Sequence, residues 1–94
     1  MTQAQLVKEF IKGVSEGNND GKHNLVIRDG KLIHYYTLLG QHYDGKIIVN
    51  LTRYSLVTGR IQKMLKEQIP EERLIIAKKV PEGTKDSLIS FIAK

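Results

Sequence analysis

The chain of 94 residues contains no cysteine. This absence excludes disulfide bonds, zinc sites that rest on cysteine, and catalysis by a cysteine nucleophile. It fits a reducing compartment, so we expect a cytoplasmic protein. No apolar run is long enough to predict a membrane-spanning helix. The opening segment, MTQAQLVKEF, lacks a basic stretch followed by a continuous apolar one, so we expect no secretory signal and no membrane partner.

The chain also has little that marks a site of chemistry. No glycine-rich loop with a phosphate-binding lysine is present. The histidines, His23, His34 and His42, lack the spacing of metal ligands. Two histidines and a lysine can cleave phosphodiesters, but we expect His34 to pack within the sheet and the other two to be solvated near strand ends. We therefore predict no cofactor, no metal, no catalytic residue and no enzymatic activity.

What the chain does contain is enough apolar material for one folded domain. Hydrophobic residues make up 40% of it, which is ordinary for a globular protein. A chain of this length rarely divides into two cores, so we predict a single domain over 1–94. The formal net charge is +5. A charge of this sign raises the rate of encounter with nucleic acid or acidic proteins.

The N-terminal segment, 1–17, is predicted to hold a helix over 2–14. Thr2 and Gln5 have the spacing of a capping box. The apolar residues that follow recur at intervals that place them on one helical face. Glycines mark the end of the helix, because glycine readily adopts the left-handed cap conformation. The polar stretch that comes next, 15–22, is expected to form a loop.

Two Asp-Gly pairs, Asp29-Gly30 and Asp44-Gly45, separate apolar runs. Asp-Gly supplies the positive φ angles of a type I′ hairpin turn. We therefore predict a three-stranded antiparallel meander within 23–51, with strands over 24–28, 31–43 and 46–51.

The middle strand of this meander carries further information. The first turn predicts a register in which the opposed pairs are Ile27 and Leu32, Val26 and Ile33, and Leu25 and His34. Gly40 indicates a bulge or bend near the far end of the strand. Apolar side chains occupy both faces of the strand. The sheet is therefore expected to be covered on both sides or to leave one face for a partner, and a homodimer is one such arrangement.

The rest of the chain is predicted to alternate helix and strand. A helix over 55–69 carries basic residues every three positions and ends at Pro70. A strand rich in branched residues follows over 73–80. Thr84 is expected to cap a last helix within 84–93. The predicted fold is α+β, with the order α-β-β-β-α-β-α.

Between the third strand and the basic helix lies a dense group of polar residues. We call it the polar corner: Asn50, Thr52, Arg53, Tyr54, Ser55, Thr58 and Arg60. A helix N-terminus and two arginines suit a phosphate or carboxylate, and Tyr54 can stack on a base. The alternative is that Ser55 or Thr58 caps the helix, Asn50 satisfies a turn and Tyr54 packs in the core. Both interpretations remain open at this point.

Several residues around the corner also resemble a small domain family of unknown function from bacteriophages, archaeal viruses and mobile elements. The similar residues lie over about 23–65 and include His23-Asn24-Leu25, Gly30, Leu32, Tyr35 or Tyr36 with Thr37, Asp44-Gly45-Lys46, Val49 to Ser55, Thr58, Arg60 and Gln62. The specific part is the Asn-x-Thr-Lys/Arg-Tyr-Ser motif. The chain departs from the family pattern at Ile61, where a histidine is expected. The resemblance implies a viral or mobile-element origin and supplies no catalytic residue.

These observations predict a small accessory protein that binds nucleic acid through the corner and the basic helix. The expected contact residues are Asn50, Thr52, Arg53, Tyr54, Ser55, Thr58, Arg60, Lys63 and Lys66, with the arginines and lysines on phosphates. An alternative is an inhibitor that binds a host defence protein or another host enzyme, in the manner of an anti-CRISPR protein. A third is a small nuclease. Under a viral origin the location is the host cytoplasm.

Overall fold

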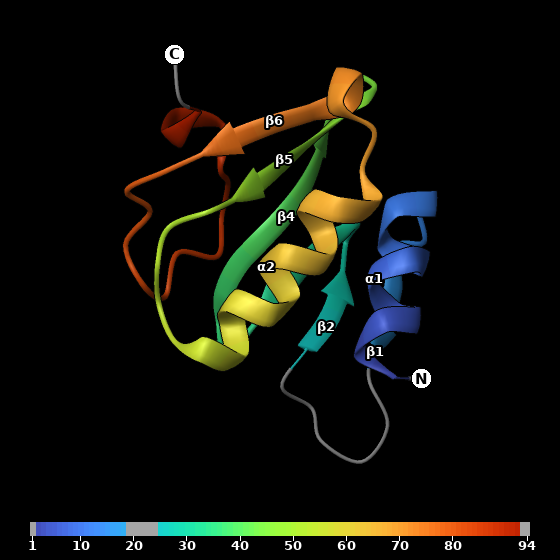
Figure 1. Cartoon of the computed structure of the whole chain (residues 1–94), viewed down its shortest axis with the longest axis horizontal. Helices are drawn as coiled ribbons and strands as arrows, with labels where there is room; N and C mark the ends of the chain where they lie inside the picture. The colour runs from blue at the N-terminus through green and yellow to red at the C-terminus, as the bar shows by residue number, and fades with distance from the viewer. Residues whose placement is uncertain (1, 19–24, 93–94) are drawn as a thin grey trace.

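A computed structural model describes residues 2–18 and 25–92 and shows one six-stranded sheet with helices (Figure 1). The strands are β1 (Glu16–Asn18), β2 (Leu25–Arg28), β3 (Lys31–His34), β4 (Thr37–Tyr43), β5 (Lys46–Asn50) and β6 (Leu74–Ala77). The α-helices are α1 (Gln3–Lys12) and α2 (Leu56–Gln68), and Glu71–Arg73 and Ile89–Phe91 form short 3-10 helices. The strands are neighbours in sequence order. The predicted α+β class is confirmed.

Both helices begin at the residues that local sequence favours. The Thr2 hydroxyl accepts a hydrogen bond from the Gln5 backbone N–H, and the Gln5 side chain accepts one from the Thr2 N–H, so the predicted capping box forms. Gly13 ends α1 in the left-handed conformation, with φ of 101°. Ser55 is the N-cap of α2, since its hydroxyl accepts from the Thr58 N–H at 3.2 Å.

The first hairpin has the predicted register, with Leu25 opposite His34 and Ile27 opposite Leu32. The predicted bulge is also present, because Ile33 pairs with Leu38 while Leu32 pairs with Gly40, which leaves Leu39 as the extra residue. Gly40 has a second role here. A Cβ atom at this position would lie 2.7 Å from the Phe10 ring of α1, so glycine permits the helix to approach the sheet.

The predicted strand over 31–43 is wrong, because a turn at Tyr35 and Tyr36 divides it into β3 and β4. Both tyrosines have positive φ angles, 47° and 68°. Tyrosine is not a turn residue, so the sequence shows no break there. Length is a signal that could have found it. Strands in globular proteins usually have about 3–10 residues, and the predicted strand over 31–43 is longer than this range.

The predicted polar loop over 15–22 is also wrong in part. Glu16–Asn18 forms β1, which pairs with β2 at the edge of the sheet. A short polar strand at an edge satisfies its backbone without presenting an apolar pattern, so periodicity does not reveal it. The remainder of that loop, and the start of the predicted first strand, lie outside the described residues.

The predicted helix over 84–93 is wrong for the described part, 84–92, where the helical residues are those of the 3-10 turn Ile89–Phe91. Backbone groups of this segment form hydrogen bonds with residues of β4 instead. The Thr84 carbonyl accepts from the Leu38 N–H at 2.7 Å, and the Leu88 N–H donates to Gln41 Oε1 at 2.7 Å. A helix would use these groups internally and would leave the buried Gln41 side chain without this bond.

Both faces of the sheet are covered by the chain itself. The helices pack on one face over a core that includes Leu6, Phe10, Leu32, Val49 and Ile61. The C-terminal segment packs on the other face, where Leu88 joins Leu38, Ile48, Ala77 and Val80. The apolar character of the middle strands is thus explained by intramolecular packing. β6 runs parallel to β5 after the α2 crossover and brings the segment after it beside the polar corner.

Candidate functional site

The polar corner is held together by the buried Asn50 side chain. Its amide nitrogen donates to the Leu38 carbonyl and lies 3.0 Å from the Tyr54 hydroxyl. Its amide oxygen accepts from the Thr52 N–H at 2.9 Å. Gln62 of α2 completes the arrangement, because its amide nitrogen donates to the carbonyls of Asn50 and Thr52, each at 2.8 Å. Asn50 therefore ties the end of β5 to β4 and to the loop that leads into α2.

The same corner is tied to the segment after β6. The Tyr54 hydroxyl donates to the Val80 carbonyl, and the Thr52 hydroxyl accepts from the Val80 N–H at 2.9 Å. The Leu51 N–H donates to the Ala77 carbonyl at 2.9 Å. These bonds satisfy polar atoms that would otherwise be costly to bury. The predicted contact residues Asn50, Thr52 and Tyr54 thus have internal partners.

The N-terminus of α2 is satisfied in a similar way. The Ser55 hydroxyl donates to Thr58 Oγ1 at 3.1 Å, and Thr58 Oγ1 lies 3.0 Å from Nδ1 of His34. Thr58 is buried and Ser55 is exposed at the surface. Ser55 therefore caps the helix, which is the folding role that the sequence also allowed, and the Thr58 hydroxyl joins the helix to His34 at the end of β3.

His34 is only 1% exposed, and the prediction that it packs within the sheet is confirmed. Burial lowers the pKa of His34 below its usual value of 6.5, because the charged imidazolium loses its hydration. Its Nε2 atom has no hydrogen-bond partner among the described residues. This burial separates the ring from any ligand at the surface, so the structure offers no support for the nuclease alternative at His34.

The other histidines give no catalytic arrangement either. His42, which we expected to be solvated, is half-buried against Phe10: its Nε2 atom lies 2.6 Å from the Phe10 carbonyl, and the ring centroids are 4.9 Å apart. That expectation was wrong because the bulge in β4 turns this residue toward α1. His23 lies outside the described residues. Within 2–18 and 25–92, no three His, Cys, Asp or Glu side chains cluster to hold a metal.

The predicted cations occupy a different environment from the amides and hydroxyls. Arg53, Arg60, Lys63 and Lys66 are all exposed. Arg53, Arg60 and Lys63 line a groove of about 610 Å³ between α2 and the loop that precedes it. Leu51, Tyr54, Ser55, Leu56, Gly59 and Gln62 form the rest of its lining. We call this the corner groove.

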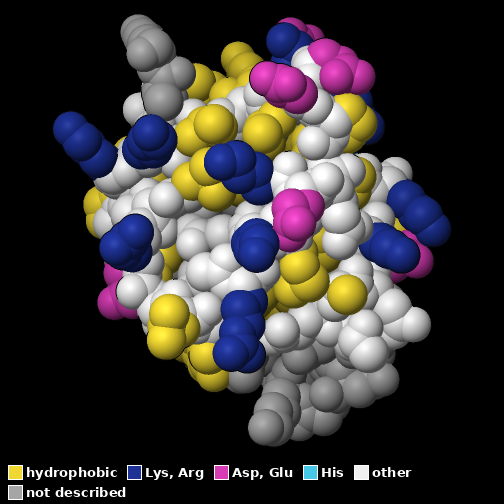
Figure 2. Space-filling model, in the orientation of Figure 1, with side chains coloured by type: hydrophobic (Ala, Val, Ile, Leu, Met, Phe, Trp, Pro, Cys, Tyr) yellow, Lys and Arg dark blue, Asp and Glu magenta, His cyan; other side chains and the backbone are white. Residues whose placement is uncertain are grey.

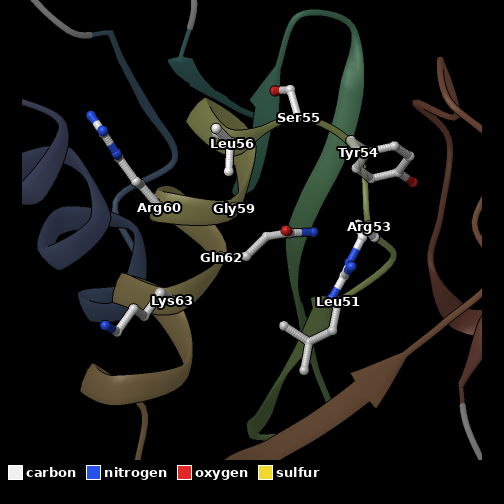
Figure 3. A pocket seen from close by; sticks show the side chains of 9 residues that line it. All are labelled: Leu51, Arg53, Tyr54, Ser55, Leu56, Gly59, Arg60, Gln62 and Lys63. Carbon is white, nitrogen blue, oxygen red and sulfur yellow. The ribbon is translucent and has the colours of Figure 1, made fainter.

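Figure 3 shows how these side chains lie in the groove. Gln62 extends from α2 toward the loop, where Arg53 and Leu51 form the opposite wall. Arg60 and Lys63 project from the helix on the side away from Arg53. The cations are thus spread along the groove rather than aimed at one point, which suits a ligand with several negative charges along its length better than a single anion.

The surface around the groove is predominantly basic. Figure 2 shows Lys and Arg side chains spread over the face that carries α2, with Asp and Glu side chains mostly toward its margins. None of the four predicted cations has a carboxylate partner within 4.0 Å among the residues that the structure describes. Their charges are therefore available to a ligand, since no internal ion pair neutralises them.

Lys78 and Lys79 extend this surface, and sequence reasoning missed their position. Both are exposed and follow β6, in the segment whose flanking residues bond to Leu51 and Thr52. A signal was available, because a strand, a helix and a second strand in succession predict parallel neighbours whose C-terminal ends meet at one edge. That pairing places the segment that carries the two lysines beside Leu51 and Thr52, which precede Arg53 in the loop.

Comparisons with known proteins identify no relative of this chain. No protein-family model, no curated protein and no solved structure matches the chain. None of the helices among the described residues is long and apolar enough to cross a membrane.

Proposed function

We propose that this protein binds nucleic acid through the corner groove and the exposed basic face of α2. The observation that carries the proposal is a set of exposed cations without carboxylate partners among the described residues: Arg53, Arg60 and Lys63 line the groove, and Lys66 lies further along α2. Phosphates bind such cations with release of counterions, which makes the interaction favourable at low salt. The net charge of +5 supports the same class of ligand.

The internal hydrogen bonds of the corner give the groove a defined shape. Asn50, Thr52 and Tyr54 hold the loop that carries Arg53 against β6, and Ser55 and Thr58 hold the start of the helix that carries Arg60. A cation on a loop fixed in this way loses less conformational freedom when it binds. In this proposal the amides and hydroxyls position the groove, and the arginines and lysines contact phosphates.

The proposed setting follows from the resemblance described above. In this proposal the chain is a viral or mobile-element accessory protein that acts in the host cytoplasm and performs no catalysis. A homodimer belongs to the same set of proposals, although both sheet faces are covered by the chain itself. Light scattering at several protein concentrations tests it directly.

The central experiment measures the binding of labelled DNA and RNA oligonucleotides by fluorescence anisotropy over a range of salt concentrations. We compare the wild type with Arg53→Ala/Arg60→Ala and with Lys8→Ala/Lys46→Ala, which removes the same charge from exposed positions outside the groove. The arginine variant is expected to lose at least about tenfold in affinity at moderate salt, and its salt slope is expected to fall by about 1.4 on single strands.

Two outcomes of this experiment would overturn the proposal. One is that the wild type binds no oligonucleotide at low salt. The other is that the lysine control weakens binding as much as the arginine variant, because binding would then follow net charge and not the groove.

A protein partner is the second candidate, and one observation favours it. Leu56 lines the groove and is 88% exposed, and the adjacent Val57 is 47% exposed; neighbouring exposed apolar side chains rimmed by polar residues are a common feature of protein contacts. In this alternative the chain inhibits a host defence protein or another host enzyme. A pulldown from nuclease-treated host lysate tests it, with Leu56→Ser as the matched variant. A stoichiometric protein that wild type retains and the variant loses would favour the inhibitor.

A further inference from the structure

The turn between β3 and β4 differs from the other two-residue turns of the meander. Asp29-Gly30 and Asp44-Gly45 have φ angles of 52° and 74°, and of 52° and 76°. Tyr35 and Tyr36 adopt the same pair of positive φ angles, 47° and 68°. Positive φ at both central positions is the geometry of a type I′ turn, for which Asn-Gly or Asp-Gly is preferred. Here two tyrosines occupy it.

Tyrosines at these two positions lower the stability of the fold, and the partial burial of their rings offsets little of that loss. A residue with a Cβ in the left-handed region loses about 1 kcal/mol or more relative to glycine. Tyr35 is 58% exposed and Tyr36 is 74% exposed, so neither ring contributes much to the core. Strain that folding does not require is a reason to look for a role in binding.

The two rings are nevertheless held in place. The Tyr35 ring packs on the His34 ring with centroids 4.5 Å apart and an interplanar angle of 59°. The ammonium group of Lys85 lies 5.7 Å from the centroid of the Tyr36 ring. His34 is itself bonded to Thr58 of α2. The turn thus presents two supported aromatic rings to solvent.

The turn lies at the same end of the sheet as the corner groove. Hydrogen bonds connect the two places in two steps, from His34 to Thr58 at 3.0 Å and from Thr58 to Ser55 at 3.1 Å. Ser55 lines the groove. In Figure 3 the turn between β3 and β4 arches beside Ser55. The turn that carries the two rings therefore adjoins the end of the groove formed by Ser55, and Lys85 adds a cation beside the Tyr36 ring.

We infer that the ligand of this surface is single-stranded nucleic acid, with unpaired bases stacked on Tyr35 and Tyr36 while phosphates contact the cations of the groove. The inference rests on the proposed function and names its substrate class. Stacking on an aromatic side chain requires a base whose face is free, which a single strand offers and the interior of a duplex does not. Cations alone bind both forms, so the tyrosines supply the preference for single strands.

The test replaces the tyrosines with the residues that the turn itself prefers. The variant Tyr35→Asn/Tyr36→Gly keeps the type I′ geometry and removes both rings. It is expected to unfold at a higher temperature than wild type, because the strain is relieved. Its affinity for a labelled single-stranded oligonucleotide is expected to fall by at least about tenfold, as the loss of base stacking on aromatic rings predicts. Its affinity for a duplex of the same sequence should change less than about twofold.

Two further variants sharpen the result. Tyr43→Asn removes an exposed tyrosine beside the Asp44-Gly45 turn, outside the groove lining, and is expected to leave single-strand affinity unchanged. Tyr35→Phe/Tyr36→Phe retains the aromatic faces without the hydroxyls. It is expected to recover most of the affinity that the Asn-Gly variant loses, since stacking uses the ring.

The outcomes separate this inference from the proposed function. Equal single-strand affinity of wild type and the Asn-Gly variant overturns the inference and leaves the proposed function standing if Arg53→Ala/Arg60→Ala still weakens binding. Absence of any oligonucleotide binding by wild type overturns both. A nuclease-resistant host protein that binds wild type but not the Asn-Gly variant, with no effect on oligonucleotides, overturns the inference and assigns the turn to a protein contact.

Discussion

The polar corner has an inner and an outer part, and the two use their polar atoms differently. In the inner part, Asn50, Thr52, Tyr54 and Gln62 donate to or accept from backbone groups of the surrounding strands and loops. In the outer part, Arg53 and the cations of α2 have no partner among the described residues. Residues that are adjacent in sequence therefore differ in their role: the inner ones hold the fold together, and the outer ones leave their charge exposed to solvent.

The comparison teaches that a dense polar segment is weak evidence for a ligand site by itself. Amides and hydroxyls at a chain reversal are needed to satisfy buried backbone groups. Long cations have no such task, because their charge is too costly to bury without a partner. On this distinction, substitutions in the inner part should reduce stability, and substitutions in the outer part should reduce binding and leave stability unchanged.

The largest loss of stability is expected for Asn50→Ala. The change removes the bond to the Leu38 carbonyl and the bond from the Thr52 N–H and leaves these groups unsatisfied in a buried site. We expect the free energy of unfolding to fall by about 3 kcal/mol. Urea unfolding followed by circular dichroism measures it. A loss below about 1 kcal/mol would show that the inner part does not hold the corner together.

A smaller loss is expected for Tyr54→Phe, which keeps the ring and removes only the hydroxyl. That hydroxyl donates to the Val80 carbonyl, so its removal should cost about 1 kcal/mol in the same unfolding measurement. Tyr43→Phe is the matched control, because the Tyr43 ring is exposed. Equal effects of the two substitutions would mean that the bond to Val80 contributes nothing to the free energy of unfolding.

His34 predicts how the inner part responds to pH. Its pKa in the folded protein is lowered from 6.5 by burial, so the unfolded chain binds the proton more readily. The stability contributed by the neutral ring is complete above pH 6.5 and is lost as pH falls below that value toward the folded pKa. Thermal unfolding measured from about pH 7.5 to about pH 5 should show this decline.

The control for this pH dependence is His34→Gln, which removes the titrating ring. The variant should show a shallower decline than wild type over the same range. A parallel decline in the two proteins would assign the pH dependence to other groups.

The smallest effect on stability is expected for the outer part. Arg53→Ala/Arg60→Ala should change the free energy of unfolding by no more than about 0.5 kcal/mol, because exposed side chains without partners contribute little. The same variant is the one expected to lose affinity for oligonucleotides. If its stability falls by 2 kcal/mol or more, on the order of a core substitution, the separation between the two parts fails.

Some predictions from the sequence were confirmed and others were wrong, for physical reasons. Thr2 with Gln5, Ser55 and the Asp-Gly turns are local signals, in which a few neighbouring residues satisfy one another's backbone groups, and the structure confirms each of them. The turn at Tyr35 and Tyr36 is made of residues that turns rarely carry, and the extended C-terminal segment depends on contacts with residues far away in sequence. No local pattern reveals either feature, so these two predictions were wrong.

The sequence by itself determined the class of fold, the two α-helices, the register of the first hairpin and the stretch in which polar residues gather. The spacing of apolar residues and the residue types at turns carry this information, because each depends on residues that are close in sequence. Only the tertiary structure decided which of those polar residues face inward. The parallel pairing of β5 and β6 brings Val80 to the Tyr54 hydroxyl, which in turn lies 3.0 Å from the buried Asn50 amide. The same pairing leaves the charge of Arg53 at the surface, where solvation favours it.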